Sequence, residues 1–301
     1  MTTKKVAVLG CSGMLGSMVS NYLSKNKDLK IIGTLRNEKP KSFQYPDVEW
    51  KKLDAENVNV VGIEKVLEGV EWVINCIGII KPYIHDDNAI ETERAISVNA
   101  LFPHLLAKAV EKIGTKVIQI ATDCVYSGLK GKYTEQDNFD VLDVYGKTKN
   151  LGEVYSPNVF HLRCSIIGPE IKSHLSLMDW FLAQPKNAEI NGFSNHKWNG
   201  ITTFHFAKLC EGIIEKNLIL PRIQHIIPQN KLSKAEILDI FKTVYGLQDI
   251  KIKIVEAPIV VNRTLSTNNS KINNQIWFAA DYKKPPTIQA MIRELYQFGV
   301  Q

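Results

Sequence analysis

The chain has 301 residues, of which 45% are hydrophobic and 23% charged, and its formal net charge at pH 7 is +6. A chain of this length buries a large core without disulfides or a structural metal, as one domain or as two. Its longest apolar run, residues 73–80, is far shorter than the ~20 residues that cross a bilayer, which excludes a membrane-spanning helix.

The five cysteines are odd in number and widely spaced, which predicts a reduced, cytoplasmic protein without disulfides. No CxxC, HxxxH or HExxH spacing occurs, so no metal site is predicted. The basic residues are scattered, without a run that is interleaved with aromatic residues. This pattern favours an anionic small ligand over nucleic acid.

Short β-branched runs alternate with amphipathic segments over the first 165 residues. This rhythm predicts an α/β fold with a Rossmann-type, doubly wound parallel sheet, whose ligands bind beyond the carboxyl ends of the strands. The expected strands are 5–9, 30–35, 48–53, 72–76, 116–121 and 159–164, and the expected helices are 14–25, 60–68, 87–113 and 143–155.

The rhythm changes after about residue 168. Helix-like segments at 176–182, 203–216 and 233–244 alternate with short strand candidates and an Asn- and Gly-rich stretch at 191–200. We therefore predict two parts. Residues 1–165 form the parallel-sheet domain, and residues 166–301 form a smaller mixed α/β region that binds substrate, some of whose segments are free to return to the sheet.

The strongest motif is a GxxGxxG sequence that directly follows the first strand and opens the first helix. Glycines allow the tight turn and let the backbone approach a pyrophosphate, whose charge the exposed amides and the positive helix end stabilise. Residues 1–165 are therefore predicted to bind NAD(P), with contacts from Gly10, Ser12, Gly13, Met14, Leu15 and Gly16.

Arg36 ends the second strand, where an NAD-specific fold usually has Asp or Glu. A guanidinium pairs with a 2′-phosphate whereas a carboxylate repels it, so NADPH is favoured and NADH stays open. Asn99 is an unfavourable residue inside a long predicted helix and invites a functional or bridging role. The remaining predicted cofactor contacts are Asp54, Cys76, Ile77, Gly78 and Asn99.

Tyr145 and Lys149 form a YxxxK pair on one face of a predicted helix. A nearby ammonium lowers the pKa of a phenol, which then exchanges a proton with a substrate oxygen, and the same lysine can hold the nicotinamide ribose. A second YxxxK at 126–130 is interrupted by glycine and is assigned to a loop. Thr122, at the end of the fifth strand, is the third predicted catalytic residue because its hydroxyl can donate to a reacting carbonyl.

With these residues the chain resembles the extended short-chain dehydrogenases/reductases, and among them the dTDP-4-dehydrorhamnose reductase branch. The resemblance covers residues 4–170 and is looser beyond. It is carried by Gly10-x-x-Gly13-x-x-Gly16, Asp54, Asn75, Asn99, Thr122-Asp123-x-Val125-Tyr126-x-Gly128, Tyr133-x-Glu135-x-Asp137, Tyr145-Gly146-Lys147-Thr148-Lys149-x-x-Gly152-Glu153 and Arg163.

The resemblance implies hydride transfer from NADPH to the C4 ketone of a 4-keto-6-deoxy nucleotide sugar, in surface polysaccharide or deoxysugar biosynthesis, with Tyr145 protonating the oxygen. Cys124 stands where related dehydratases carry Glu or Lys, which favours simple reduction. Asp143 and Val144 replace the proline expected just before the tyrosine, so the sugar and the base stay open. The candidate substrate contacts are Lys81, Tyr126, Ser165, His196, Trp198 and Asn199.

Two alternatives remain at this stage. One is a nucleotide-sugar epimerase or dehydratase with tightly bound NAD, although Arg36 argues against it. The other is a non-catalytic, NADP-binding regulatory subunit, like that of methionine adenosyltransferase, which resembles the same reductases. The expected partner is the nucleotide-sugar substrate, and a homodimer is left open.

Overall fold

The computed structural model describes residues 3–40, 43, 45, 47–171 and 174–300. Its centre is a seven-stranded sheet in the order β11-β6-β5-β4-β1-β2-β3, with every neighbouring pair parallel. This arrangement confirms the predicted Rossmann-type α/β class. The strands are β1 (Lys4–Leu9), β2 (Leu29–Leu35), β3 (Val48–Lys52), β4 (Trp72–Asn75), β5 (Lys116–Ala121), β6 (Val159–Arg163) and β11 (Ile223–His225).

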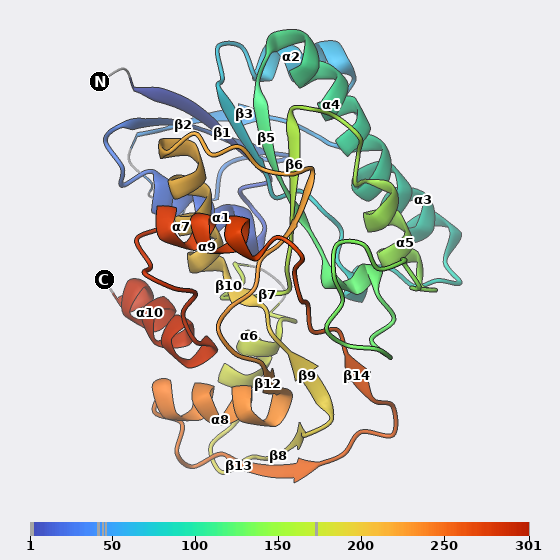
Figure 1. The fold of residues 1–301 in the computed structure, drawn as a ribbon, viewed down its shortest axis with the longest axis vertical. Coiled ribbons are helices and arrows are strands. Elements are labelled where there is room, and N and C mark those ends of the chain that lie inside the picture. Colours follow the sequence, from blue (N-terminus) through green and yellow to red (C-terminus); the bar gives the residue numbers. More distant parts are fainter. Residues whose placement is uncertain (1–2, 41–42, 44, 46, 172–173, 301) are drawn as a thin grey trace.

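Helices cover both faces of this sheet (Figure 1), because successive side chains of a strand point to opposite faces. Val6 and Val8 belong to one hydrophobic core, which the sheet shares with α1 (Met14–Leu23), α7 (Thr203–Glu215) and α9 (Ser270–Ala279). Ala7 and Leu9 belong to a second core on the other face, shared with α2 (Val60–Val66) and α4 (Phe102–Ile113).

The single helix expected over residues 87–113 is wrong in detail. The segment consists of α3 (Ala89–Ala95), a π-helical stretch over Ile96–Leu101, and α4. The helix α5 (Val144–Leu151) is also shorter than the predicted 143–155. It ends before Gly152, which packs on the π-helical stretch. Only glycine fits there, since a Cβ atom would lie 2.0 Å from the carbonyl oxygen of Asn99.

A smaller part lies below the sheet in Figure 1. Its elements are α6 (Leu177–Leu182), α8 (Lys234–Val244), α10 (Ile288–Val300), the pair β7 (Ile166–Ile167) and β10 (Ile201–Thr202), the pair β8 (Glu189–Phe193) and β13 (Lys251–Val255), and the three-stranded sheet of β9 (His196–Trp198), β12 (Leu232–Ser233) and β14 (Val261–Asn262). Between these elements the chain returns to the large sheet as β11. Over the described ranges, no helix combines the length and apolar character needed to cross a membrane.

Candidate active site

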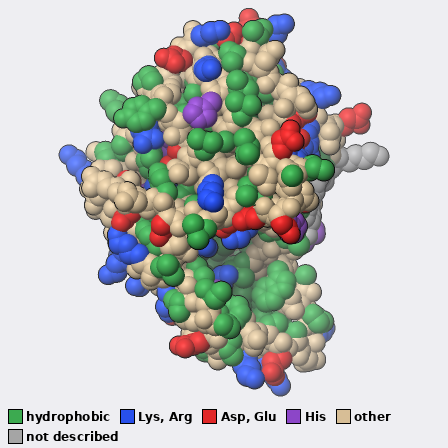
Figure 2. Space-filling model, turned by 90° about the vertical axis from the view of Figure 1, so that its right-hand side faces the viewer, with side chains coloured by type: hydrophobic (Ala, Val, Ile, Leu, Met, Phe, Trp, Pro, Cys, Tyr) green, Lys and Arg blue, Asp and Glu red, His purple; other side chains and the backbone are tan. Residues whose placement is uncertain are grey.

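A cavity of about 550 Å³ opens at the carboxyl ends of the central strands, and Figure 2 shows a recess between the larger and the smaller part. Its volume is typical of small-molecule sites. Many of the residues singled out from the sequence line it together: Ser12, Gly13, Met14, Leu15, Arg36, Cys76, Ile77, Gly78, Thr122, Tyr145, Lys149 and Ser165.

The loop between β1 and α1 is shaped by two glycines that are not among the lining residues. Gly10 has a φ of +81°, and a Cβ atom there would lie 2.8 Å from Cγ1 of Ile77. A Cβ atom at Gly16 would lie 2.3 Å from the carbonyl oxygen of Gly10. The loop is therefore packed so closely that only glycine fits these two positions.

The first turn of α1 faces the cavity through residues 12–15. Gly13 caps this helix without a side-chain hydrogen bond, and the first turn carries no acidic residue. The free amides and the positive helix end therefore remain available to an anion. These residues fit the pyrophosphate of a dinucleotide.

Arg36 lines the cavity at the end of β2, with its side chain 51% exposed, and its Nη1 donates to Oε1 of Glu56 at 2.9 Å. Asp54 lies outside the lining. It accepts hydrogen bonds from the Asn57 side chain and the Glu56 amide, and the bond from Asn57 lowers the pKa of Asp54. Its carboxylate therefore shapes the loop that follows β3, and a cofactor contact from Asp54 stays a prediction.

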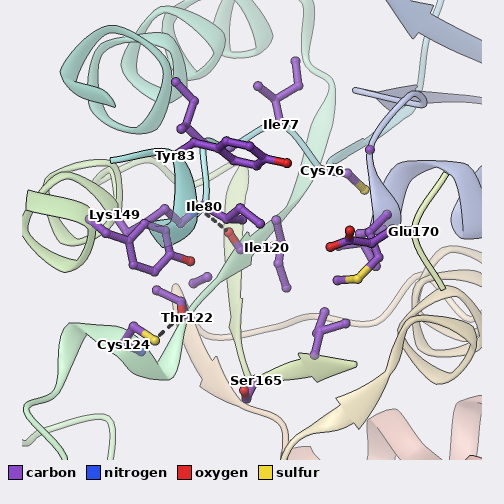
Figure 3. Close-up of a pocket in the computed structure, with 18 of the residues that line it drawn as sticks. Cys76, Ile77, Ile80, Tyr83, Ile120, Thr122, Cys124, Lys149, Ser165 and Glu170 are labelled. Atoms are coloured by element: carbon purple, nitrogen blue, oxygen red, sulfur yellow. Dashed lines mark hydrogen bonds between the residues drawn. The ribbon is translucent and has the colours of Figure 1, made fainter. Parts of the chain in front are cut away.

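Tyr145 and Lys149 both project from α5 into the cavity. The helix is started by Asp143, whose carboxylate accepts from the Gly146 amide at 2.8 Å. The Lys149 side chain is buried and donates to the carbonyl oxygen of Ile120 at 3.2 Å, as drawn in Figure 3. Burial lowers the pKa of Lys149 to about 8, because removal from water disfavours the charged form.

Burial raises the pKa of Tyr145, and the nearby Cys124 and Asp123 raise it further. A hydrogen bond with the Thr122 side chain opposes the shift. The net shift of this pKa is upward, opposite to the expected lowering, because burial of the phenol is the largest effect. Tyr145 remains a phenol, which is a proton donor.

Thr122 follows β5 and begins a short 3₁₀ helix over Asp123–Val125. Its Oγ1 accepts a hydrogen bond from the Cys124 amide at 3.1 Å, the interaction drawn between these residues in Figure 3. This contact fixes the turn and holds the hydroxyl at the cavity wall, beside Tyr145. The three predicted catalytic residues therefore share one site.

Asn99 does not line the cavity but bridges the elements that form it. Its side-chain amide exchanges two hydrogen bonds with the backbone of Ile79, at 2.8 and 2.9 Å, and donates to Oγ1 of Thr148 at 3.3 Å. The loop after β4 is thereby tied to α5. Of the two roles considered for Asn99, the structure shows the bridging one.

Two of the candidate substrate contacts are used inside the fold. Tyr126 is fully buried, stacks on Tyr133 with ring centroids 4.2 Å apart, and donates to the carbonyl of Thr134. Asn199 is buried and exchanges two 2.8 Å hydrogen bonds with the backbone of Leu265. Both predictions are corrected for the same reason: the polar groups already have partners within the fold.

Of the other candidate substrate contacts, one lines the cavity and three do not. Ser165 lines the cavity, on the side formed by the smaller part. Trp198 and His196 on β9 are not among the lining residues, and His196 Nε2 contacts the carbonyl oxygen of Ile259 at 2.9 Å. Lys81 is also outside the lining and forms an exposed ion pair with Asp143 at 2.7 Å.

Some lining residues were missed by the sequence analysis, among them Tyr83, Arg94 and Glu170. Figure 3 shows Tyr83 and Glu170 projecting into the cavity from different sides. Tyr83 belongs to a 3₁₀ helix over Lys81–Tyr83, and Glu170 follows β7. Arg94 lies in α3. None of the three belongs to a recognisable motif, so only the folded chain reveals them.

A family model described as the RmlD substrate binding domain matches residues 4–167. A dTDP-4-dehydrorhamnose reductase of Aggregatibacter actinomycetemcomitans is 28% identical over 169 residues, which is 54% of this chain and 51% of that protein. The match to that reductase therefore spans only about half of its length. Methionine adenosyltransferase 2 subunit beta of Rattus norvegicus is 24% identical over 271 residues, which is 86% of this chain and 77% of that protein.

The fold is also found among solved structures. The dTDP-4-dehydrorhamnose reductase of Bacillus anthracis, solved in complex with NADP, superposes with a TM-score of 0.73 at 16% identity and covers 99% of both chains. At this identity the likeness concerns the fold alone.

Proposed function

Since the chain belongs to the RmlD substrate binding domain family, we propose that it is an NADPH-dependent oxidoreductase that reduces a 4-keto-6-deoxy nucleotide sugar. The observation that carries this proposal is that Thr122, Tyr145 and Lys149 line one cavity together with the first turn of α1. The backbone amides of α1 can bind a pyrophosphate on one side of that cavity, and Tyr145 can donate a proton on the other.

A bound nicotinamide would supply the hydride to the carbonyl carbon. Tyr145 would donate its phenolic proton to the carbonyl oxygen, so that the ketone becomes an alcohol. Thr122 would hold the same oxygen through its hydroxyl as negative charge develops. Lys149, whose pKa is about 8, would hold the nicotinamide ribose and stabilise the phenolate that remains.

NADPH is proposed as the cofactor because Arg36 lines the cavity at the end of β2, where it can pair with a 2′-phosphate. NADH is the alternative cofactor. The substrate is proposed to enter from the side of Ser165 and Glu170, which reach the cavity from the smaller part.

The test is the loss of NADPH absorbance when purified protein is mixed with a 4-keto-6-deoxy nucleotide sugar. Tyr145→Phe removes only the phenolic hydroxyl and is expected to lower the rate by about 10²–10⁴-fold, as general acid catalysis is lost. Tyr155→Phe is the matched control, because Tyr155 is 91% exposed and outside the cavity. Unchanged turnover by the Tyr145→Phe variant would refute the assigned role.

A second candidate is a non-catalytic regulatory subunit, which the match to methionine adenosyltransferase 2 subunit beta over 86% of the chain favours. The presence of Thr122, Tyr145 and Lys149 in one cavity favours the enzyme instead. NADPH binding without turnover of any nucleotide sugar, together with stoichiometric co-purification of a larger enzyme, would support the regulatory role. Protein that is purified with bound NAD+ and needs no added cofactor would point to an epimerase or dehydratase.

A further inference from the structure

Arg36 shares its carboxylate partner with a second arginine. Nη1 of Arg36 lies 2.9 Å from Oε1 of Glu56, and Nε of Arg94 lies 2.8 Å from the same oxygen. Arg36 directly follows β2, Glu56 lies after β3 and Arg94 belongs to α3, so three separate segments meet at this point. Both arginines line the cavity that also contains the first turn of α1.

The cluster of Arg36, Glu56 and Arg94 has a net charge of +1, because it contains two guanidinium groups and one carboxylate. Each guanidinium has five N–H donors, and the contact with Glu56 uses one nitrogen of each. The side chains are 51% and 43% exposed, so the remaining donors are accessible from the cavity. Two guanidinium groups held close together are well suited to a phosphate, which each can bind through two parallel hydrogen bonds.

We propose that Arg94 acts with Arg36 to bind the 2′-phosphate of NADPH, and that Glu56 is the counter-charge that limits the preference for NADPH over NADH. The inference rests on the proposed use of a nicotinamide cofactor. The phosphate replaces Glu56 as the partner of the two guanidinium groups and is repelled by its carboxylate. NADH has only a hydroxyl at this position, so it leaves the Arg–Glu–Arg cluster as it is.

The proposal predicts opposite effects for the two members of one ion pair. In Arg94→Met the stem is retained and the charge is lost, so the Kd for NADPH is expected to rise about 10- to 100-fold, the range for losing one charge-assisted hydrogen bond. In Glu56→Gln the repulsion is lost, so the Kd for NADPH is expected to fall severalfold. The Kd for NADH is expected to stay the same in Arg94→Met.

Binding is measured by titrating the fluorescence of NADPH and of NADH separately, with thermal unfolding of each variant as a check of folding. Arg94→Lys is a second variant, which retains the positive charge but loses the planar guanidinium group. Its Kd for NADPH is expected to lie between those of the wild type and Arg94→Met. Lys112→Met is the matched control because it breaks another surface ion pair, Lys112–Glu64 at 2.9 Å, whose residues do not line the cavity.

The NADPH-specific loss in Arg94→Met and the gain in Glu56→Gln would together support the proposal. It would be overturned if Arg94→Met weakened the binding of NADPH and NADH equally, or if Glu56→Gln weakened the binding of NADPH. Either result is expected of an ion pair that only supports the fold, because its loss affects the binding of both cofactors in the same direction. If folded wild-type protein binds neither cofactor, the proposed function fails, and this inference fails with it.

Discussion

Arg163→Met tests how the returning strand β11 is held at the edge of the large sheet. Arg163 is fully buried on β6. Its Nε donates to Glu153 at 3.0 Å, and its Nη1 lies 2.8 Å from both the Tyr126 hydroxyl and Nε2 of His225. His225 is on β11, the strand through which the chain returns to the large sheet. The guanidinium therefore joins β6, the segment after α5 and the returning chain.

The expected cost comes from the charge that the substitution leaves behind. The Glu153 side chain is only 4% exposed, so without Arg163 its carboxylate is buried and unpaired. Removing one partner of a buried ion pair costs about 3–5 kcal/mol. With a denaturant slope of about 3 kcal/mol per M of urea for a chain of this size, a loss of about 4 kcal/mol lowers the unfolding midpoint by about 1.3 M.

Urea unfolding followed by tryptophan fluorescence measures this shift. In the double variant Arg163→Met, Glu153→Met no charge remains buried, and much of the stability is expected to return. Lys27→Met is the matched control, because the Lys27–Asp47 pair is 81% and 68% exposed and its loss costs at most about 1 kcal/mol. A loss under about 1 kcal/mol for Arg163→Met, or a double variant no more stable than the single one, would refute the reasoning.

Two further predictions concern the cofactor loop and the lysine. Gly16→Ala places a Cβ atom 2.3 Å from the Gly10 carbonyl oxygen, so the loop must shift and NADPH affinity is expected to fall. In Gly13→Ala the nearest atom is 3.5 Å from the new Cβ atom, so a smaller loss is expected. Equal affinities of the two variants in an NADPH titration would contradict this. The reduction rate is expected to fall as the pH rises through about 8, where Lys149 loses its proton. Glu153→Gln removes a charge that raises the pKa of Lys149, so the fall is expected at lower pH, and an unchanged pH–rate profile would exclude this coupling.

The parts of the fold that were predicted correctly depend on local signals. Each strand of the first part could be located to within one residue because its β-branched run is short and is flanked by turns or helices. The loop between β1 and α1 could be located because glycine spacing reports backbone geometry directly. The long helix over 87–113 was predicted without its π-helical stretch. That stretch packs against Gly152, the residue after α5, and a contact between such distant segments has no local signal.

Side-chain partners were predicted less well, since they are supplied by the tertiary structure. The spacing of Tyr145 and Lys149 places them on one helix face, but it does not show that the Lys149 ammonium is bound to the Ile120 carbonyl. Tyr126 has the polarity of a substrate contact, but its hydroxyl is bound to Thr134 and Arg163. The Arg36–Glu56–Arg94 cluster joins three segments, and the sequence marked only Arg36 among them.

The protonation states at the site suit the first step of the proposed reduction. Below about pH 8, Tyr145 is a neutral phenol and Lys149 is an ammonium ion. A ketone reduction uses this pair as it stands, because the phenol donates its proton while the ammonium stabilises the phenolate that forms. The ionisation of Tyr145 and Lys149 therefore matches the proton donor and the counter-charge that the proposed ketone reduction requires at its start.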